Sequence, residues 1–257
     1  MPHVVVNGAR LYYEEHGEGE PILCIHATGS SALMWEEALP PLATLGRVIA
    51  YDRRGCTRSE RPEPYEETTV AEHGDDAAAL LAALGATPAT IIGRSYGGEV
   101  AIDLALRHAA HVRALALLEP FVPRLSEAAD AWLRALAEQL EAADDAGEAL
   151  IEAVFGAGAW ETLPADMRTM FSDNGPAILA ETRREFEQAD PAALAAIDRP
   201  ALLVSATDSP PALREVMDGL AAAMPHARTV QVGGGHAIDP AGAEVMAFVR
   251  EQNATRG

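Results

Sequence analysis

The stretch Thr90-Ile91-Ile92-Gly93-Arg94-Ser95-Tyr96-Gly97-Gly98 decides the fold. A short apolar run leads into Gly-x-Ser-x-Gly, and a stretch of helical character follows. A strand that turns sharply into a helix strains the backbone of the residue at the apex, and only small neighbours avoid a clash there. The apex side chain is then exposed at the end of the sheet, beside the positive N-terminal end of a helix. The pattern therefore predicts that Ser95 is a nucleophile.

A serine hydroxyl needs a base, and position selects one of the eight histidines. His236 follows the last predicted strand, in a glycine-rich loop that can reach over the end of the sheet. Six others occupy ordinary strand, turn or helix contexts. His108 and His111 are three residues apart, but no carboxylate motif completes a metal site beside them. We therefore expect His236 to be the base, and we expect no metal and no cofactor.

The imidazole in turn needs an acid that orients it, and two carboxylates follow predicted strands. Asp208 lies just past the end of the apolar run Ala201–Ser205, at the edge where α/β sheets bind ligands. Glu119 follows an earlier strand and is the rival. Asp208 could instead cap the helix that begins at Pro211. The order Ser95, Asp208, His236 matches the nucleophile–acid–base order of this strand–turn–helix arrangement, so we expect Asp208 to be the acid.

An oxyanion hole would complete such a site. The backbone N–H of Tyr96, which follows the nucleophile, is one expected donor. The second should come from the loop His26-Ala27-Thr28-Gly29-Ser30 after an early strand. We assign the N–H of Thr28, with Ala27 as the close alternative. Each such preorganised donor contributes about 3 kcal/mol to stabilising the transition state.

Outward from Ser95, short apolar runs alternate with amphipathic ones, which predicts an α/β protein with a mostly parallel, doubly wound sheet. The Asn7-Gly8 turn predicts a hairpin and an antiparallel edge at the N-terminus. The predicted strands are His3–Val6, Arg10–Glu14, Pro21–His26, Arg47–Tyr51, Thr90–Ile92, Ala114–Leu118, Ala201–Ser205 and Thr229–Val232. The predicted helices between them are Leu33–Leu45, Val70–Leu84, Gly97–His108, Pro211–Met224 and Pro240–Glu251.

Residues 121–195 break this alternation and predict a helical lid inserted into a single domain, whose core comprises 1–120 and 196–257. Helices are expected over Ser126–Ala143, Glu148–Phe155 and Ile178–Gln188. Trp132 and Phe155 are the lid residues that could line a substrate pocket. Ala27, Arg94 and Glu119 are the other pocket candidates. Arg94 could bind a substrate carboxylate or form a structural ion pair, and Asp52 and Arg53 are expected to hold a turn.

The composition excludes several classes of function. All 19 basic residues are arginine against 39 acidic residues, which gives a net charge of −20. The lack of lysine excludes Schiff-base chemistry, pyridoxal enzymes and the P-loop lysine. The negative charge argues against nucleic acid or an anionic membrane as a partner. Without a signal peptide, a membrane span or a cysteine framework, we expect a cytoplasmic monomer or homodimer that acts on a small molecule.

These motifs together resemble the α/β-hydrolase fold superfamily, of the esterase, lactonase and cofactor-free haloperoxidase type. The resemblance spans nearly the whole chain: Asn7–Glu14, the His26 loop, Asp52–Ser59, the Ser95 turn, Asp208 and Gly235-His236. It implies a serine hydrolase that cleaves a carboxylic ester or lactone without a cofactor. The chain departs from the family in having His26-Ala27 in place of His-Gly, and in the short stretch from His236 to Pro240.

Other functions remain open on the same residues. The resemblance also covers perhydrolysis, hydrolysis of a carbon–carbon bond and cleavage of a cyanohydrin by the same triad. Haloalkane dehalogenases and epoxide hydrolases of this fold carry aspartate at the apex, whereas this chain has Ser95. A ligand receptor or binding module with a nearly idle triad is the alternative from another class. Turnover of a small activated ester that disappears when Ser95 becomes alanine would separate the two classes.

Overall fold

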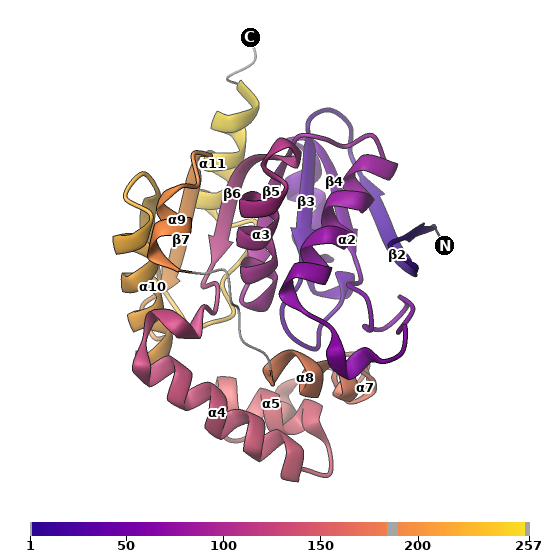
Figure 1. Cartoon of the computed structure of the whole chain (residues 1–257), viewed down its shortest axis with the longest axis vertical. Coiled ribbons are helices and arrows are strands. Elements are labelled where there is room, and N and C mark those ends of the chain that lie inside the picture. Colours follow the sequence, from indigo (N-terminus) through magenta and orange to yellow (C-terminus); the bar gives the residue numbers. More distant parts are fainter. Residues whose placement is uncertain (1, 184–189, 255–257) are drawn as a thin grey trace.

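Eight strands form one sheet in the computed structural model, which describes residues 2–183 and 190–254 (Figure 1). Their order across the sheet is β1-β2-β4-β3-β5-β6-β7-β8. β1 pairs with β2, and β2 with β4, in antiparallel fashion, whereas all other neighbours are parallel. The strands are β1 His3–Val6, β2 Ala9–His16, β3 Pro21–Ile25, β4 Arg47–Tyr51, β5 Ala89–Arg94, β6 Val112–Leu118, β7 Ala201–Ala206 and β8 Arg228–Val232. The predicted fold class and antiparallel N-terminal edge are confirmed.

The central strands are apolar on both faces because helices cover both. Successive residues of a strand point to opposite faces, so Ile91 and Ile92 of β5 belong to two different apolar clusters. One cluster lies beneath α2 Val70–Ala83, α3 Tyr96–Arg107 and α10 Pro211–Ala223. The other lies beneath α1 Leu39–Ala43 and α11 Ala243–Ala254. This double cover holds the carboxyl ends of β5 and β6 in place, and the candidate site is built there.

The segment expected as one helix over Leu33–Leu45 is instead two short pieces. A 3₁₀ turn, η1, covers Ala32–Trp35, and the five-residue helix α1 starts only at Leu39. Pro40 and Pro41 have no backbone N–H, so they cannot donate the hydrogen bonds that would continue a helix from the preceding turn. The prolines are tolerated because they occupy the first turn of the new helix.

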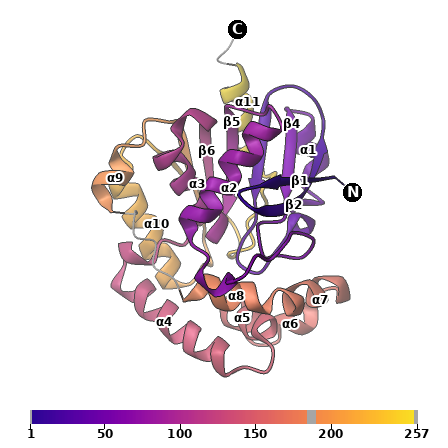
Figure 2. The same ribbon diagram turned by 45° about the vertical axis from the view of Figure 1, so that its right-hand side comes forward.

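The segment between β6 and β7 contains helices and no strand within residues 121–183 and 190–195. The helices are α4 Glu127–Ala142, α5 Ala146–Phe155, α6 Ala159–Thr162, α7 Ala165–Asp173, α8 Gly175–Thr182 and α9 Pro191–Ala195. Figures 1 and 2 show α4, α5, α7 and α8 gathered across the end of the sheet at which β6 terminates. The helix predicted over Ile178–Gln188 corresponds to α8, and its second half lies outside the described residues. None of the described helices is long and apolar enough to cross a bilayer.

Candidate active site

Ser95 occupies the sharp turn between β5 and α3. Its backbone has φ 49° and ψ −120°, a region that residues other than glycine rarely adopt. Close packing of the backbone makes the glycines necessary: a Cβ on Gly93 would lie 2.5 Å from the carbonyl oxygen of Gly97, and one on Gly97 would collide with the carbonyl of Ile25. The N–H of Ser95 donates to the carbonyl of Leu118 on β6 at 3.0 Å. The strained turn is thus held by backbone packing around Gly93 and Gly97 and by the hydrogen bond to β6.

His236 is paired with a carboxylate, and that carboxylate belongs to Glu119. The distance from Nδ1 of His236 to Oε2 of Glu119 is 2.7 Å, and the Glu119 side chain is completely buried. A carboxylate can only accept, so Nδ1 carries the proton and donates it. In the neutral ring, Nε2 is then left as an acceptor. This is the tautomer that a general base requires.

Glu119 is held by groups from the neighbouring strand as well. Its Oε1 accepts from the backbone N–H of Ala206 at 2.8 Å, and its Oε2 accepts from the hydroxyl of Ser209 at 2.8 Å. Burial raises the pKa of Glu119, but the hydrogen bonds from His236, Ala206 and Ser209 outweigh burial and hold the pKa below its ordinary value. The carboxylate is therefore ionised at neutral pH and fixed in place.

The prediction of Asp208 as the orienting acid is wrong. Asp208 is exposed, and its backbone N–H donates to the carbonyl of Gly234 at 2.9 Å. The adjacent strands β6 and β7 end at the same edge, so a carboxylate after either one can approach the histidine loop. Glu119, which sequence analysis considered as the rival, makes the contact because its side chain points inward and is anchored by β7.

Ser95 and His236 line one apolar cavity with a volume of about 90 Å³. Ala27, Thr28, Arg94, Trp132 and Phe155 also line it, as do aliphatic and aromatic residues of the inserted helices. The structure thus brings the predicted pocket residues together, except Glu119, which lies behind His236. Within the described residues no hydrogen bond joins the Ser95 hydroxyl to His236. The ring centroids of Phe155 and His236 lie 6.1 Å apart. Phe155 is also 46% exposed to solvent.

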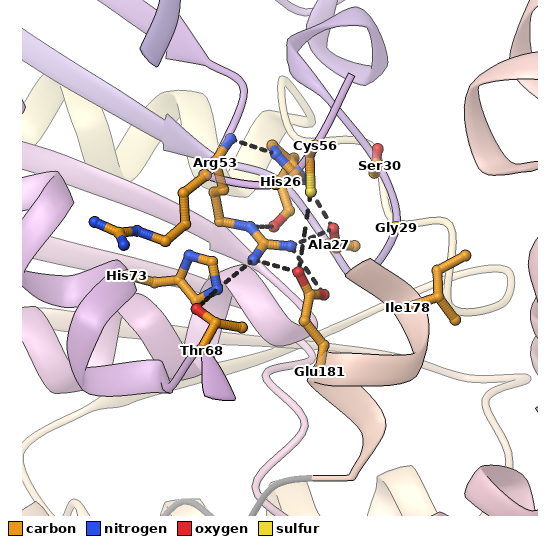
Figure 3. A network of polar contacts seen from close by, with 12 residues as sticks. His26, Ala27, Gly29, Ser30, Arg53, Cys56, Thr68, His73, Ile178 and Glu181 are labelled. Carbon is orange, nitrogen blue, oxygen red and sulfur yellow. Dashed lines mark hydrogen bonds and ion pairs between the residues drawn. The ribbon is translucent and has the colours of Figure 1, made fainter. Parts of the chain in front are cut away.

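The loop after β3 is anchored by Arg53 (Figure 3). Nε of Arg53 donates to the carbonyl of His26 at 3.2 Å, and Nη2 donates to the carbonyl of Ala27 at 3.0 Å. The His26 ring accepts from the N–H of Arg53 at 2.9 Å and donates from Nδ1 to the carbonyl of Ala27 at 2.8 Å. Burial, aided by the Arg53 charge, holds the pKa of His26 well below its usual range, so the ring is neutral.

This anchoring fixes the direction of the next peptide group. In a trans peptide the C=O of one residue and the N–H of the following residue point in opposite directions, and the bond between Ala27 and Thr28 is trans. The carbonyl of Ala27 points toward Arg53, so the N–H of Thr28 points to the opposite side. Thr28 lines the cavity that also contains Ser95. The peptide group between Ala27 and Thr28 therefore directs its N–H away from Arg53.

Arg53 is itself paired with a residue of the inserted helices. Its Nη1 and Nη2 lie 2.7 and 3.1 Å from the two carboxylate oxygens of Glu181 on α8, and both side chains are completely buried. Nearby, the amide of Asn174 donates to the carbonyls of Gly29 at 2.9 Å and Ser30 at 3.2 Å. Asn174 and Glu181 are not predicted by the sequence, because no local pattern links them to partners more than 120 residues earlier.

We expect the change Glu181→Gln to lower the free energy of unfolding by about 3–5 kcal/mol, because it leaves the buried Arg53 cation without its counter-charge. Urea unfolding at pH 7 measures this. The matched control is Glu141→Gln, which removes an exposed ion pair with Arg183 in the same insertion. That variant should lose less than about 1 kcal/mol. Equal losses in the two variants would contradict the importance of the buried pair.

The sequence and the fold both resemble those of known proteins. Residues 20–156, just over half of the chain, match the family model for the alpha/beta hydrolase fold. The chain belongs to this family. Among curated α/β-hydrolase relatives, the uncharacterized hydrolase YraK of Bacillus subtilis is 36% identical over 120 residues, which are 47% of this chain and 44% of that protein. The 2-hydroxymuconate semialdehyde hydrolase of a Pseudomonas species is 35% identical over 120 residues, 45% of this chain and 41% of that protein.

Solved structures of α/β hydrolases resemble the whole chain. The enol-lactonase of Burkholderia xenovorans LB400 is 26% identical and has a TM-score of 0.75, with 97% of each chain covered. The esterase RhEst1 of a Rhodococcus species is also 26% identical and has a TM-score of 0.76, with 99% of this chain and 98% of that chain covered. By sequence, however, this α/β hydrolase spans less than half the length of the curated relatives named above.

Proposed function

We propose that this protein is a serine hydrolase that cleaves carboxylic esters or lactones. The observation that carries the proposal is the pairing of His236 with the buried, ionised Glu119, in a cavity wall that also contains the strained Ser95. The similarity to an enol-lactonase and an esterase over nearly the whole chain supports the choice of bond.

The first half of the reaction transfers the acyl group to the protein. Oγ of Ser95 attacks the carbonyl carbon while Nε2 of His236 takes the hydroxyl proton. Negative charge moves to the carbonyl oxygen, which accepts hydrogen bonds from the N–H groups of Tyr96 and Thr28. The tetrahedral species then expels the alcohol oxygen, to which His236 returns the proton. Glu119 keeps the ring oriented and stabilises its cationic form.

The second half releases the acid. Water gives a proton to Nε2 of His236 and attacks the acyl carbon, and a second tetrahedral oxyanion forms in the same hole. Collapse breaks the bond to Oγ of Ser95, which receives the proton from His236. An ester yields an acid and an alcohol, whereas a lactone yields one open-chain hydroxy acid. The apolar cavity keeps bulk water away from the charges that develop.

The identity of the nucleophile favours acyl transfer over the other reactions known for relatives. The matched proteins include haloalkane dehalogenases and a soluble epoxide hydrolase. A serine that attacked a haloalkane or an epoxide would form an ether, which has no carbonyl carbon for water to attack. An acyl-serine has that carbon and can be hydrolysed. Ser95 therefore supports an ester or lactone as the substrate.

A covalent probe tests the proposal without knowledge of the natural substrate. A small fluorophosphonate should add once to the native protein by intact-mass measurement, and peptide mapping should place it on Ser95. The same protein unfolded in urea should not react, because the strained turn and the base are then lost. A native protein that neither takes the label nor hydrolyses p-nitrophenyl acetate would instead be a binding module.

A further inference from the structure

Arg94 is a buried cation that forms no ion pair in the part of the chain that the structure describes. Three arginines are buried among the described residues, and Arg53 and Arg54 each pair with a buried carboxylate. Arg94 is only 8% exposed but forms no ion pair within residues 2–183 and 190–254. Its hydrogen bond in that part of the chain runs from Nη2 to the carbonyl of His236 at 3.3 Å. A guanidinium has five N–H donors, so most of its donor capacity is unused.

The position of Arg94 brings this charge to the reacting groups. It is the last residue of β5 and precedes Ser95 directly. It lines the inner cavity of about 90 Å³, which contains Ser95 and His236, and also an outer cavity of about 660 Å³ between the insertion and the His236 loop. Arg94 thus belongs to the wall of both cavities.

The charges around the two cavities differ in sign. The described lining of the inner cavity contains no carboxylate, and Arg94 is its one arginine. The outer cavity is lined by Arg94 and by four carboxylates: Glu36, Glu37, Asp166 and Asp239. Burial lowers the pKa of Arg94 to about 10, opposed by the charges of Glu119 and Asp239, so the group is protonated at neutral pH. A substrate anion that contacts Arg94 is therefore repelled less in the inner cavity than in the outer cavity, where the lining carboxylates are.

We propose that Arg94 binds a carboxylate carried by the substrate, so that the preferred substrates are esters or lactones with a carboxylate on a short apolar chain. The inference rests on the proposed hydrolase function. A buried cation that no ion pair among the described residues offsets is unfavourable, and a substrate carboxylate supplies such a pair through the parallel N–H groups of the guanidinium. The small volume and apolar walls of the inner cavity restrict the rest of the acyl chain.

Two esters of the same shape test the proposal. Monoethyl succinate carries a carboxylate, and ethyl 4-methylpentanoate carries an uncharged branched end in its place. Ethanol release at pH 7 and constant ionic strength gives kcat/KM for each. The parent should prefer monoethyl succinate. The change Arg94→Met should lower the ratio of the two kcat/KM values by about 10–100-fold, the size expected for hydrogen bonds to a charged group. Arg94→Lys, which keeps the charge, should lower the ratio less.

Inhibition by free succinate gives a second measurement on the parent protein, which decides the matter even if Arg94→Met does not fold. Succinate should compete with ethyl 4-methylpentanoate, whereas 4-methylpentanamide, which is uncharged, should compete less. A parent that hydrolyses the neutral ester as well as the charged one, and that succinate does not inhibit, overturns the role of Arg94 and leaves the hydrolase function standing. A protein that hydrolyses neither ester and does not react with the fluorophosphonate overturns both proposals.

Discussion

Replacing Glu119 with glutamine is expected to lower kcat for ester hydrolysis by about 10³–10⁴-fold, with little change in KM. The carboxylate accepts hydrogen bonds from three donors: Nδ1 of His236, the N–H of Ala206 and the hydroxyl of Ser209. A glutamine amide offers one accepting oxygen and one donating NH₂ group in place of the two carboxylate oxygens. At least one of the three groups that donate to Glu119 would therefore face the NH₂ group, which cannot accept a hydrogen bond. If the imidazole of His236 changes tautomer so that Nδ1 accepts from the NH₂ group, Nε2 carries the proton. Nε2 then cannot take a proton from Ser95.

Asp208→Asn is the matched control for this prediction, since Asp208 follows the neighbouring strand but is exposed. Its kcat should stay within about twofold of the parent. Steady-state kinetics on p-nitrophenyl acetate measures both variants, and urea unfolding checks that Glu119→Gln is folded. A large loss of kcat in Asp208→Asn, with Glu119→Gln still active, would show that the acid acts from the end of β7.

The change Ser95→Ala should reduce kcat by about 10⁶-fold, because no acyl-enzyme can form. A small rate above that in water should survive, since the oxyanion donors and the cavity remain. The fluorophosphonate should no longer add to the protein. Alanine at position 95 should not destabilise the fold, for two reasons. The backbone strain at this position is the same for serine and alanine, and the Ser95 hydroxyl caps no N–H of α3.

Ser205→Ala serves as the control for Ser95→Ala. Ser205 lies on β7, and its hydroxyl donates a long hydrogen bond to the carbonyl of Val230 at 3.5 Å. The variant should keep the parent's kcat and its single label. Hydrolysis that persists at the parent rate in Ser95→Ala would mean that another group attacks the ester, and the assignment of the nucleophile would be wrong.

The features that the sequence predicted well depend on local pattern. Among the described residues, the Asn7-Gly8 turn identified the first two strands, and apolar runs of strand length identified the other six to within a few residues. The glycines around Ser95 identified the strained turn. The position of His236 after the last strand singled it out among eight histidines, and the structure places it in the cavity that Ser95 also lines. In each case the deciding information lies within about ten residues of the feature itself.

The features that the sequence did not predict depend on distances between segments remote in the chain. Glu119 and Asp208 both follow strands of the parallel core, and only the packed structure shows which side chain points toward His236. The pair between Arg53 and Glu181 joins residues 128 positions apart. The helix expected over Leu33–Leu45 is interrupted for a local reason, because Pro40 and Pro41 cannot donate backbone hydrogen bonds to the preceding turn.

The pairing of Arg53 with Glu181 has a consequence for how such proteins can exchange parts. A helical insertion between two strands looks like a module that could be swapped between relatives to change substrate preference. Here α8 also carries the counter-charge of the arginine that anchors His26 and Ala27. A chimera that received a foreign insertion would keep the loop beside Ser95 but lose the counter-charge that supports the loop. Recombination is therefore expected to succeed where Arg53 and the residues that face it are transferred together with the insertion.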